Sequence, residues 1–256
     1  MELRYITLSG ANEFTQIDKL FEFIFSNSTD LNPNYNPIEI AIQTDSSKAS
    51  FGMARYWWIN SLYYYAKYIP HTFNFTIHVN KDWAAKFYQG DLAKELEVFL
   101  SLRYRATCEN FIGRVQINFP DTDMVVFDVK KVLAIMRNFR HIDFIFQYNE
   151  KSAEFIDELH KHTSHFSCLF DSSRGKGIVP KIWDKAPYND VFFGFAGGLS
   201  AETIAEQFPR ILASVPEGAP FWIDAESGLK DENKHFSLAK CDAYLDEIRK
   251  VATFSY

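Results

Sequence analysis

Two turns of small residues in the last quarter of the chain have the composition of a phosphate-binding site. The first follows the apolar run 191–195 and contains Gly197 and Gly198, and the second follows 221–223 and contains Ser227 and Gly228. Glycine lets backbone N–H groups approach a ligand, and a helix predicted to begin at Ser200 would add its partial positive charge. The alternative interpretation is that both turns need glycine only for their backbone geometry.

A second set of polar side chains lies at the ends of predicted strands. In six places an apolar run finishes with two polar residues two positions apart: Thr7 and Ser9, Gln43 and Asp45, His78 and Asn80, Gln116 and Asn118, Gln147 and Asn149, and Asp224 and Glu226. Residues two apart share one face of a strand, so these pairs can point into one ligand cavity. The alternative is that strand ends are polar because the loops beyond them are solvated.

Eight strand-then-helix units can be read along the chain. The predicted strands are 3–8, 38–42, 74–79, 114–117, 142–146, 167–170, 191–195 and 221–223. The predicted helices are 15–25, 53–68, 84–102, 126–138, 152–162, 201–213 and 238–253, and the sixth unit has a long loop without a strong helix. A repeating βα pattern produces a parallel sheet, and eight repeats predict an α/β fold of one domain over residues 1–256, a closed (β/α)8 TIM barrel. Such barrels bind phosphate after their last two strands.

Composition excludes several classes of partner. The 256 residues carry a net charge of −6 without a dense Lys/Arg run, so we expect no nucleic-acid or membrane partner. The N-terminus lacks a secretory signal and no apolar run is long enough to span a bilayer, which predicts a cytoplasmic protein. The three cysteines are widely spaced and indicate neither disulfides nor a metal site. No metal or redox cofactor is expected.

The sixth predicted strand and its loop read CLFDSSRGKG, from Cys168 to Gly177. With FAGGLS at 195–200 and IDAESGLK at 223–230, this segment resembles the phosphoribosylanthranilate isomerase family, which has Asp-Ser and a Gly-rich loop, then AGGL and DVSSGV. TIHVN and VQINF, at 76–80 and 115–119, are weaker matches to that family's VFVN and VQLHG. The resemblance implies a (β/α)8 barrel, a phosphosugar-like ligand and an Amadori rearrangement in tryptophan biosynthesis.

The resemblance also implies roles for individual residues. Asp171 matches the family's general acid, which protonates the ring oxygen of the phosphoribosyl group. The positions that match the phosphate-binding turns are Gly175 and Gly177, Gly197 and Gly198, and Ser227 and Gly228.

The chain departs from the family pattern at the general base. The family has Lys-Ile-Cys-Gly in its first strand, with the cysteine as the base, and this chain has a serine there, Ser9. A serine hydroxyl is far less acidic than a thiol, so Ser9 needs an activating neighbour. Lys48 is the nearest counterpart of the family's arginine that receives a carboxylate, and as a point charge it is a less specific ligand.

Other residues of the predicted mouth could bind substrate or replace the base. Asp45, His78 and Glu226 are candidates for the base, and with Gln116 they are also expected to line the substrate site. Lys48 could alternatively form a Schiff base, as in barrel aldolases.

Three functions therefore stay open. The first is an isomerase that uses Asp171 as the acid, with a base that is either unidentified or assisted by Ser9. The second is another phosphosugar enzyme, an isomerase or aldolase, with a reassigned base. The third is a protein that binds a phosphorylated small molecule without catalysis.

The segment from Arg55 to Tyr68, RYWWINSLYYYAKY, is too aromatic for one buried helical stripe. The helical period predicts that Trp58, Leu62, Tyr65 and Ile69 face the barrel while Trp57, Tyr64 and Tyr68 lie outside. Such surplus aromatic surface is typical of a subunit interface, so we expect a homodimer. The alternative is that these side chains pack under a neighbouring loop.

Overall fold

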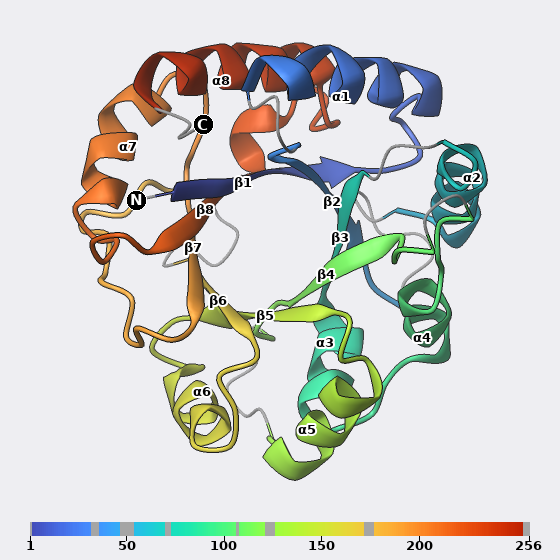
Figure 1. The fold of residues 1–256 in the computed structure, drawn as a ribbon, viewed down its shortest axis with the longest axis vertical. Helices are drawn as coiled ribbons and strands as arrows, with labels where there is room; N and C mark the ends of the chain where they lie inside the picture. The colour runs from blue at the N-terminus through green and yellow to red at the C-terminus, as the bar shows by residue number, and fades with distance from the viewer. Residues whose placement is uncertain are drawn as a thin grey trace.

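The protein is a closed barrel of eight parallel strands (Figure 1). Its structure is a computed structural model, which describes residues 2–31, 36–46, 54–69, 73–105, 108–120, 126–171 and 177–252. The strands are β1 (Glu2–Ala11), β2 (Ile38–Thr44), β3 (Asn74–Val79), β4 (Ile112–Ile117), β5 (Asp143–Tyr148), β6 (Ser167–Phe170), β7 (Phe192–Ala196) and β8 (Pro220–Ala225). Each strand pairs with its sequence neighbours, and β8 pairs with β1. The predicted (β/α)8 barrel is thus confirmed.

An outer ring of helices covers the barrel (Figure 1). They are α1 (Ile17–Leu31), α2 (Tyr56–Ala66), α3 (Lys81–Tyr88), α4 (Lys94–Leu100), α5 (Val129–Asn138), α6 (Ala153–His160), α7 (Ile204–Leu212) and α8 (Leu238–Val251), with a short 3-10 helix, η1 (Ser227–Leu229). Residues 177–191 contain no helix, in agreement with the predicted long loop of the sixth unit.

The third unit differs from the prediction, because its helix is divided. We predicted one helix over 84–102, whereas α3 ends at Tyr88 and α4 begins at Lys94. Gly90 has a φ of +78° and its N–H donates to the carbonyl of Phe87, so the chain turns out of the helical path there. Glycine adopts this left-handed conformation at little cost, which ends a helix that apolar periodicity alone would continue.

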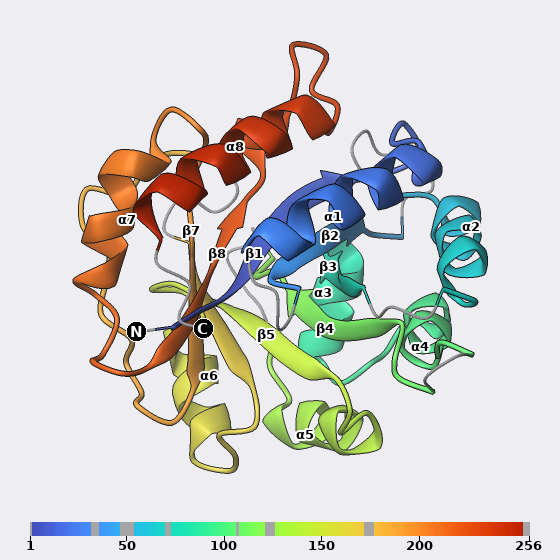
Figure 2. The ribbon, with the colours of Figure 1, turned by 45° about the horizontal axis from the view of Figure 1, so that its top comes forward.

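The first and last helices close the ring. α1 and α8 lie side by side in both ribbon views (Figures 1 and 2). Asn27 of α1 donates to Asp242 at 2.9 Å and accepts from Arg249 at 2.6 Å. This contact fixes the two ends of the chain to each other on the outside of the barrel, beside the pairing of β1 with β8.

Toward the amino ends of the strands, the barrel interior is filled by the guanidinium of Arg114, which stacks on an aromatic ring. The guanidinium of Arg114 pairs with Glu39 at 3.0 Å and with Asp143 at 3.1 Å, and it lies 4.3 Å from the ring centroid of Trp222. A Cβ on Gly194 would come within 2.0 Å of Trp222, so glycine makes room for this indole. This filled layer separates the space at the carboxyl ends of the strands from a second pocket at their amino ends, which Glu39, Arg114 and Asp143 line.

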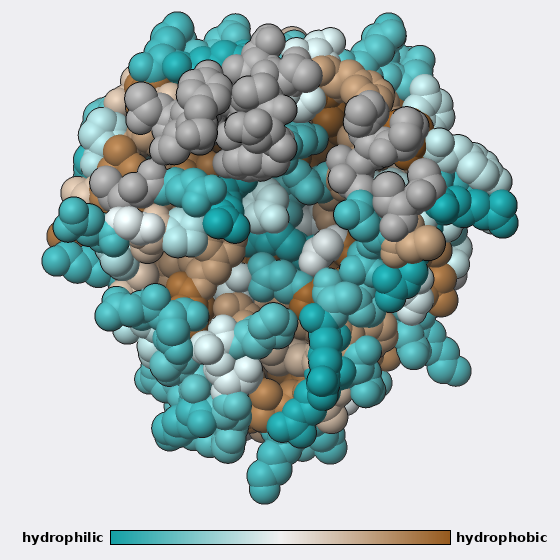
Figure 3. Space-filling view, in the orientation of Figure 1, coloured by the Kyte–Doolittle hydropathy of each residue, from teal (hydrophilic) through white to brown (hydrophobic). Residues whose placement is uncertain are grey.

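Hydrophilic residues cover most of the face seen in Figure 3, and hydrophobic residues form smaller separate areas among them. No described helix is both long and apolar enough to cross a membrane.

Candidate active site

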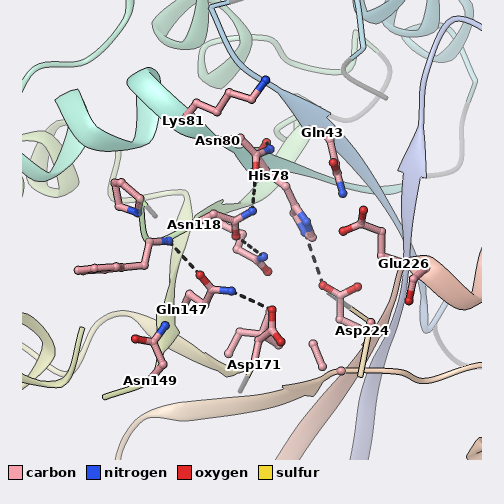
Figure 4. A pocket seen from close by; sticks show the side chains of 18 of the residues that line it. Gln43, His78, Asn80, Lys81, Asn118, Gln147, Asn149, Asp171, Asp224 and Glu226 are labelled. Carbon is pink, nitrogen blue, oxygen red and sulfur yellow. Dashed lines mark hydrogen bonds and ion pairs between the residues drawn. The ribbon is translucent and has the colours of Figure 1, made fainter. Parts of the chain in front are cut away.

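The carboxyl ends of the strands surround a cavity of about 330 Å³ (Figure 4). Nine of the twelve polar residues predicted at strand ends line it: Gln43, His78, Asn80, Gln116, Asn118, Gln147, Asn149, Asp224 and Glu226. The remaining three are Thr7, Ser9 and Asp45. The cavity wall is therefore built from amide side chains, one imidazole, a few carboxylates and two lysines, Lys81 and Lys151. Such a set binds hydroxyl, amino and phosphate groups.

Asp224, at the end of β8, is the most strongly perturbed carboxyl of this wall. Its Oδ1 accepts a 2.6 Å hydrogen bond from the hydroxyl of Ser9, which is completely buried in β1. Burial raises the pKa of Asp224 well above its usual range, while the hydrogen bond from Ser9 opposes this and the charge of Glu226 adds to it. A raised pKa makes the ionised carboxylate a stronger base, which suits a group that takes part in acid–base catalysis.

His78 lies beside Asp224, and their contact is an ion pair only if the imidazole is protonated (Figure 4). Its Nε2 is 3.8 Å from Oδ2 of Asp224. Burial, and to a smaller extent the positive charge of Arg114, lowers the pKa of His78 from 6.5 to about 3. The pKa of Asp224 is shifted in the opposite direction, so both pKa shifts favour the neutral form of the side chain. A neutral imidazole therefore faces the Asp224 carboxyl near neutral pH.

Asp171, at the end of β6, points into the same cavity (Figure 4). It is 6% exposed, and its Oδ2 accepts a 2.9 Å hydrogen bond from Nε2 of Gln147. Oε1 of Gln147 in turn accepts from the backbone N–H of Phe119 at 3.0 Å. The backbone thus fixes the orientation of the Gln147 amide, which holds the Asp171 carboxyl toward the cavity.

The turns after β6, β7 and β8 are in direct contact. A Cβ on Gly177 would lie 2.0 Å from Oγ of Ser227, and a Cβ on Gly228 would lie 2.4 Å from the carbonyl oxygen of Leu199. These glycines are needed because the loops approach one another closely, and not only because a ligand must approach them. The three turns form one unit at the rim of the cavity, which Gly177 and Ser227 line.

Two further glycines line this rim. Gly197 and Gly198 have φ values of +128° and +64°, and a Cβ on Gly198 would lie 2.5 Å from the backbone nitrogen of Val179. Among the described residues, the N–H groups of Gly197, Gly198 and Gly228 donate to no backbone or side-chain acceptor. Successive unpaired amides of this kind form the concavities that bind anions.

The predicted helix start at Ser200 is wrong, because α7 begins at Ile204. The hydroxyl of Thr203 accepts from the N–H of Ser200 at 2.9 Å and donates to the carbonyl of Gly198 at 2.8 Å. The N–H of Ser200, which was expected to face a ligand, is thus bonded to the Thr203 side chain, and the same side chain fixes the turn at Gly198. The helix terminus therefore contributes to the rim by shaping the turn.

The other predicted site residues lie in different places. Asp45 lies outside the cavity wall, since its side chain is fully buried and forms a 2.7 Å ion pair with Lys81. Glu226 lines the cavity and pairs with Lys230 at 2.6 Å. Lys48 and Gly175 lie outside the described residues.

Sequence reasoning missed the importance of two residues. It placed Asp224 and Gln147 in the mouth but assigned no role to either. The signal for Asp224 was its place at the end of a strand that must pair with the first strand in a closed barrel, where it is opposite Thr7 and two residues from Ser9. Gln147 holds Asp171 from the neighbouring strand β5, and only the pairing of β5 with β6 brings them together.

The fold and the cavity define a (β/α)8 barrel with buried carboxylates and glycine turns at its C-terminal mouth. No protein-family model matches the chain, and no curated protein sequence matches it. Among solved structures, the chain is similar to phosphoribosyl anthranilate isomerase from Thermus thermophilus, with a TM-score of 0.55 and 10% sequence identity. The match covers 97% of this chain and 100% of that one. At this identity the similarity shows a shared fold.

Proposed function

We propose that the protein is an isomerase that converts a phosphorylated aldose-type small molecule into the corresponding ketose form, with phosphoribosylanthranilate as the first substrate to test. The observation that carries the proposal is that Asp171 and Asp224, both buried, line one cavity whose rim is formed by the glycine turns. Two carboxyl groups in one site can act as acid and base on the same substrate.

Asp171 takes the acid role that the sequence resemblance implies. It donates a proton to the ring oxygen of the substrate, which opens the ring. Asp224 takes the base role: its carboxylate removes the proton from C2, which gives an enol. The C2 hydroxyl then loses its proton to solvent while C1 takes one from solvent, which forms the ketone, and the proton on Asp224 returns through solvent to Asp171. Burial raises the pKa of Asp224 and so makes its carboxylate a stronger base.

Ser9 has a different role from the cysteine at its position in the family. Its hydroxyl proton is directed at Asp224 and the residue has no exposed surface, so it is poorly placed to accept a proton from a substrate. We assign Ser9 to positioning the Asp224 carboxylate. In this proposal the base is Asp224 of the last strand, which is hydrogen-bonded to Ser9 of the first strand.

The glycine turns support a phosphate group at the rim. The amides of Gly197, Gly198 and Gly228 have no described acceptor, and close packing of the three turns holds them in place. A dianionic phosphate can accept from several of these amides without any conformational change.

A turnover assay with phosphoribosylanthranilate, run beside a thermal-shift series with phosphosugars and inorganic phosphate, tests the proposal. We expect ligand stabilisation by phosphosugars in the wild type and turnover of at least one of them. Turnover should fall at least about 100-fold in Asp171→Asn and in Asp224→Asn, because general acid–base catalysis typically contributes 10²- to 10⁴-fold. Stabilisation without turnover of any phosphosugar would indicate a binding protein instead.

A further inference from the structure

A chain of three amide side chains crosses the cavity wall from β3 to β4. Nδ2 of Asn118 donates to Oδ1 of Asn80 at 2.7 Å, and Nε2 of Gln116 donates to Oδ1 of Asn118 at 2.7 Å. All three residues line the cavity. Figure 4 shows Asn118 directed toward Asn80.

The direction of this chain is set by the backbone. Nδ2 of Asn80 faces the carbonyl oxygens of His78, at 3.0 Å, and Thr44, at 3.4 Å. Carbonyl oxygens only accept, so the amide nitrogen of Asn80 must lie on this side and its oxygen must face Asn118. The same reasoning then places the nitrogen of Asn118 toward Asn80 and the nitrogen of Gln116 toward Asn118.

Gln116 is therefore the last of the three hydrogen-bonded amides, and its side-chain oxygen accepts from neither of the other two. Gln116 is 4% exposed, and its Oε1 has no hydrogen-bond partner among the residues that the structure describes. Nε2 of His78 is also buried, and it has no hydrogen-bond partner in the described part of the chain. His78 is paired directly opposite Gln116 in the sheet. Burying an acceptor without a donor is unfavourable, so adjacent unpaired groups in a cavity wall indicate where a ligand or water binds.

We propose that Gln116 is a specificity-determining residue that accepts a hydrogen bond from a hydroxyl or amino group of the ligand at the floor of the cavity, beside His78. Asn118 and Asn80 act as positioning residues that keep the Gln116 oxygen directed to this group. The inference rests on the proposed function, because the phosphate at the glycine turns would hold the rest of the ligand over this floor. It restricts the substrate class to phosphorylated molecules with a free hydroxyl or amino group at the far end.

Calorimetric titration with inorganic phosphate and with ribose 5-phosphate tests the proposal. We expect the wild type to bind ribose 5-phosphate at least about tenfold more tightly than inorganic phosphate, since a lost hydrogen bond in such a site costs more than 1 kcal/mol. Gln116→Met, which keeps the side-chain length without a hydrogen-bonding atom, should lose most of this preference. Its affinity for inorganic phosphate should stay within about twofold of the wild type, because phosphate binds at the rim.

Two further variants make the interpretation specific. Asn118→Leu removes the acceptor that fixes the Gln116 nitrogen. It should therefore reduce the preference for ribose 5-phosphate over inorganic phosphate, although Gln116 itself is unchanged. Gln89→Met makes the matched exchange at an exposed position at the end of α3 and should change neither affinity. The native near-ultraviolet spectrum of each variant reports whether the fold is intact.

Two results would overturn the inference while leaving the proposed function in place. The first is full preference for ribose 5-phosphate in Gln116→Met, and the second is equal binding of the two probes by the wild type. Binding of neither probe to the wild type would instead contradict the proposed function, and the inference would fall with it.

Discussion

Ser9 in the first strand donates a 2.6 Å hydrogen bond to Asp224 in the last strand, 215 positions later in the chain. Closure of the barrel brings these two residues together, since β1 pairs with β8. The bond favours the charged form of Asp224, in opposition to burial.

Asp224→Asn should stabilise the protein at neutral and alkaline pH. The folded-state pKa of Asp224 is raised by burial, so above the ordinary pKa of about 4 the folded state binds more protons than the unfolded state. Stability from this group is therefore lost as pH rises. Asparagine keeps an acceptor for Ser9 and takes no charge.

Thermal unfolding between pH 5 and pH 9 checks this expectation. The difference in melting temperature between Asp224→Asn and wild type should grow as pH rises. Asp184→Asn, an exposed carboxylate in the 177–191 segment, is the control and should show a small, nearly constant difference. A variant that is less stable than the wild type at every pH would show that the carboxylate is favourable where it lies.

His78→Gln should reduce the loss of stability on the acid side. Burial lowers the folded-state pKa of His78 to about 3, whereas the unfolded chain takes up this proton near pH 6.5. Stability is therefore lost as pH falls from about 6.5 toward 3, with a slope approaching 1.4 kcal/mol per pH unit. Urea unfolding at intervals from pH 7 to pH 4.5 should show a slope lower by about one proton in the variant. Parallel pH profiles for both proteins would mean that His78 is charged in the folded state.

Gly228→Ala should separate the turns after β7 and β8. The new Cβ would meet the carbonyl oxygen of Leu199 at 2.4 Å, so the rim must open, at a cost of about 1–3 kcal/mol. We expect a lower melting temperature and at least about tenfold weaker binding of inorganic phosphate. Gly113→Ala is the matched control, because a Cβ there would meet no atom within 4 Å. Phosphate binding that survives Gly228→Ala unchanged would place the anion elsewhere.

We also expect the protein to form a homodimer through α2. Trp57, Tyr64 and Tyr68 are 57%, 61% and 62% exposed, and the ammonium of Lys67 lies 3.8 Å from the ring centroid of Tyr64. Sedimentation at micromolar concentration should give about twice the chain mass of 29.7 kDa. Trp57→Asn should shift the protein toward the monomer, while Val126→Asn, at another exposed apolar residue, should not. A wild type that sediments only as a monomer would contradict this expectation.

Local sequence patterns predicted the scaffold well. The bounds of β3 and β6 agree with the predicted ones, because apolar runs bounded by turn residues determine where a buried strand begins and ends. In α2, Trp58 and Leu62 are buried as the helical period predicts. Tyr65 was expected to face the barrel, but it is 48% exposed and stacks on Phe21 at 4.8 Å.

The site was predictable only in part, since its key contacts are between strands. Strand periodicity placed Gln116 and Asn118 on the cavity face, but it does not show which amide donates to which. The order of donors depends on carbonyl oxygens of β2 and β3 that contact Asn80. The Thr203 hydroxyl likewise bonds two positions of its own turn, which no periodic pattern reveals.

The most direct test of the account is incorporation of deuterium from solvent during phosphosugar isomerisation, followed by proton NMR in D₂O. With phosphoribosylanthranilate as substrate, the account predicts a ketose product that carries deuterium at C1. The rate should fall at least about 100-fold in Asp224→Asn and much less in Ser9→Ala, because Ser9 only positions the base. A rate in Asp224→Asn equal to that of the wild type, or a larger loss in Ser9→Ala than in Asp224→Asn, would contradict the assignment of Asp224 as the base.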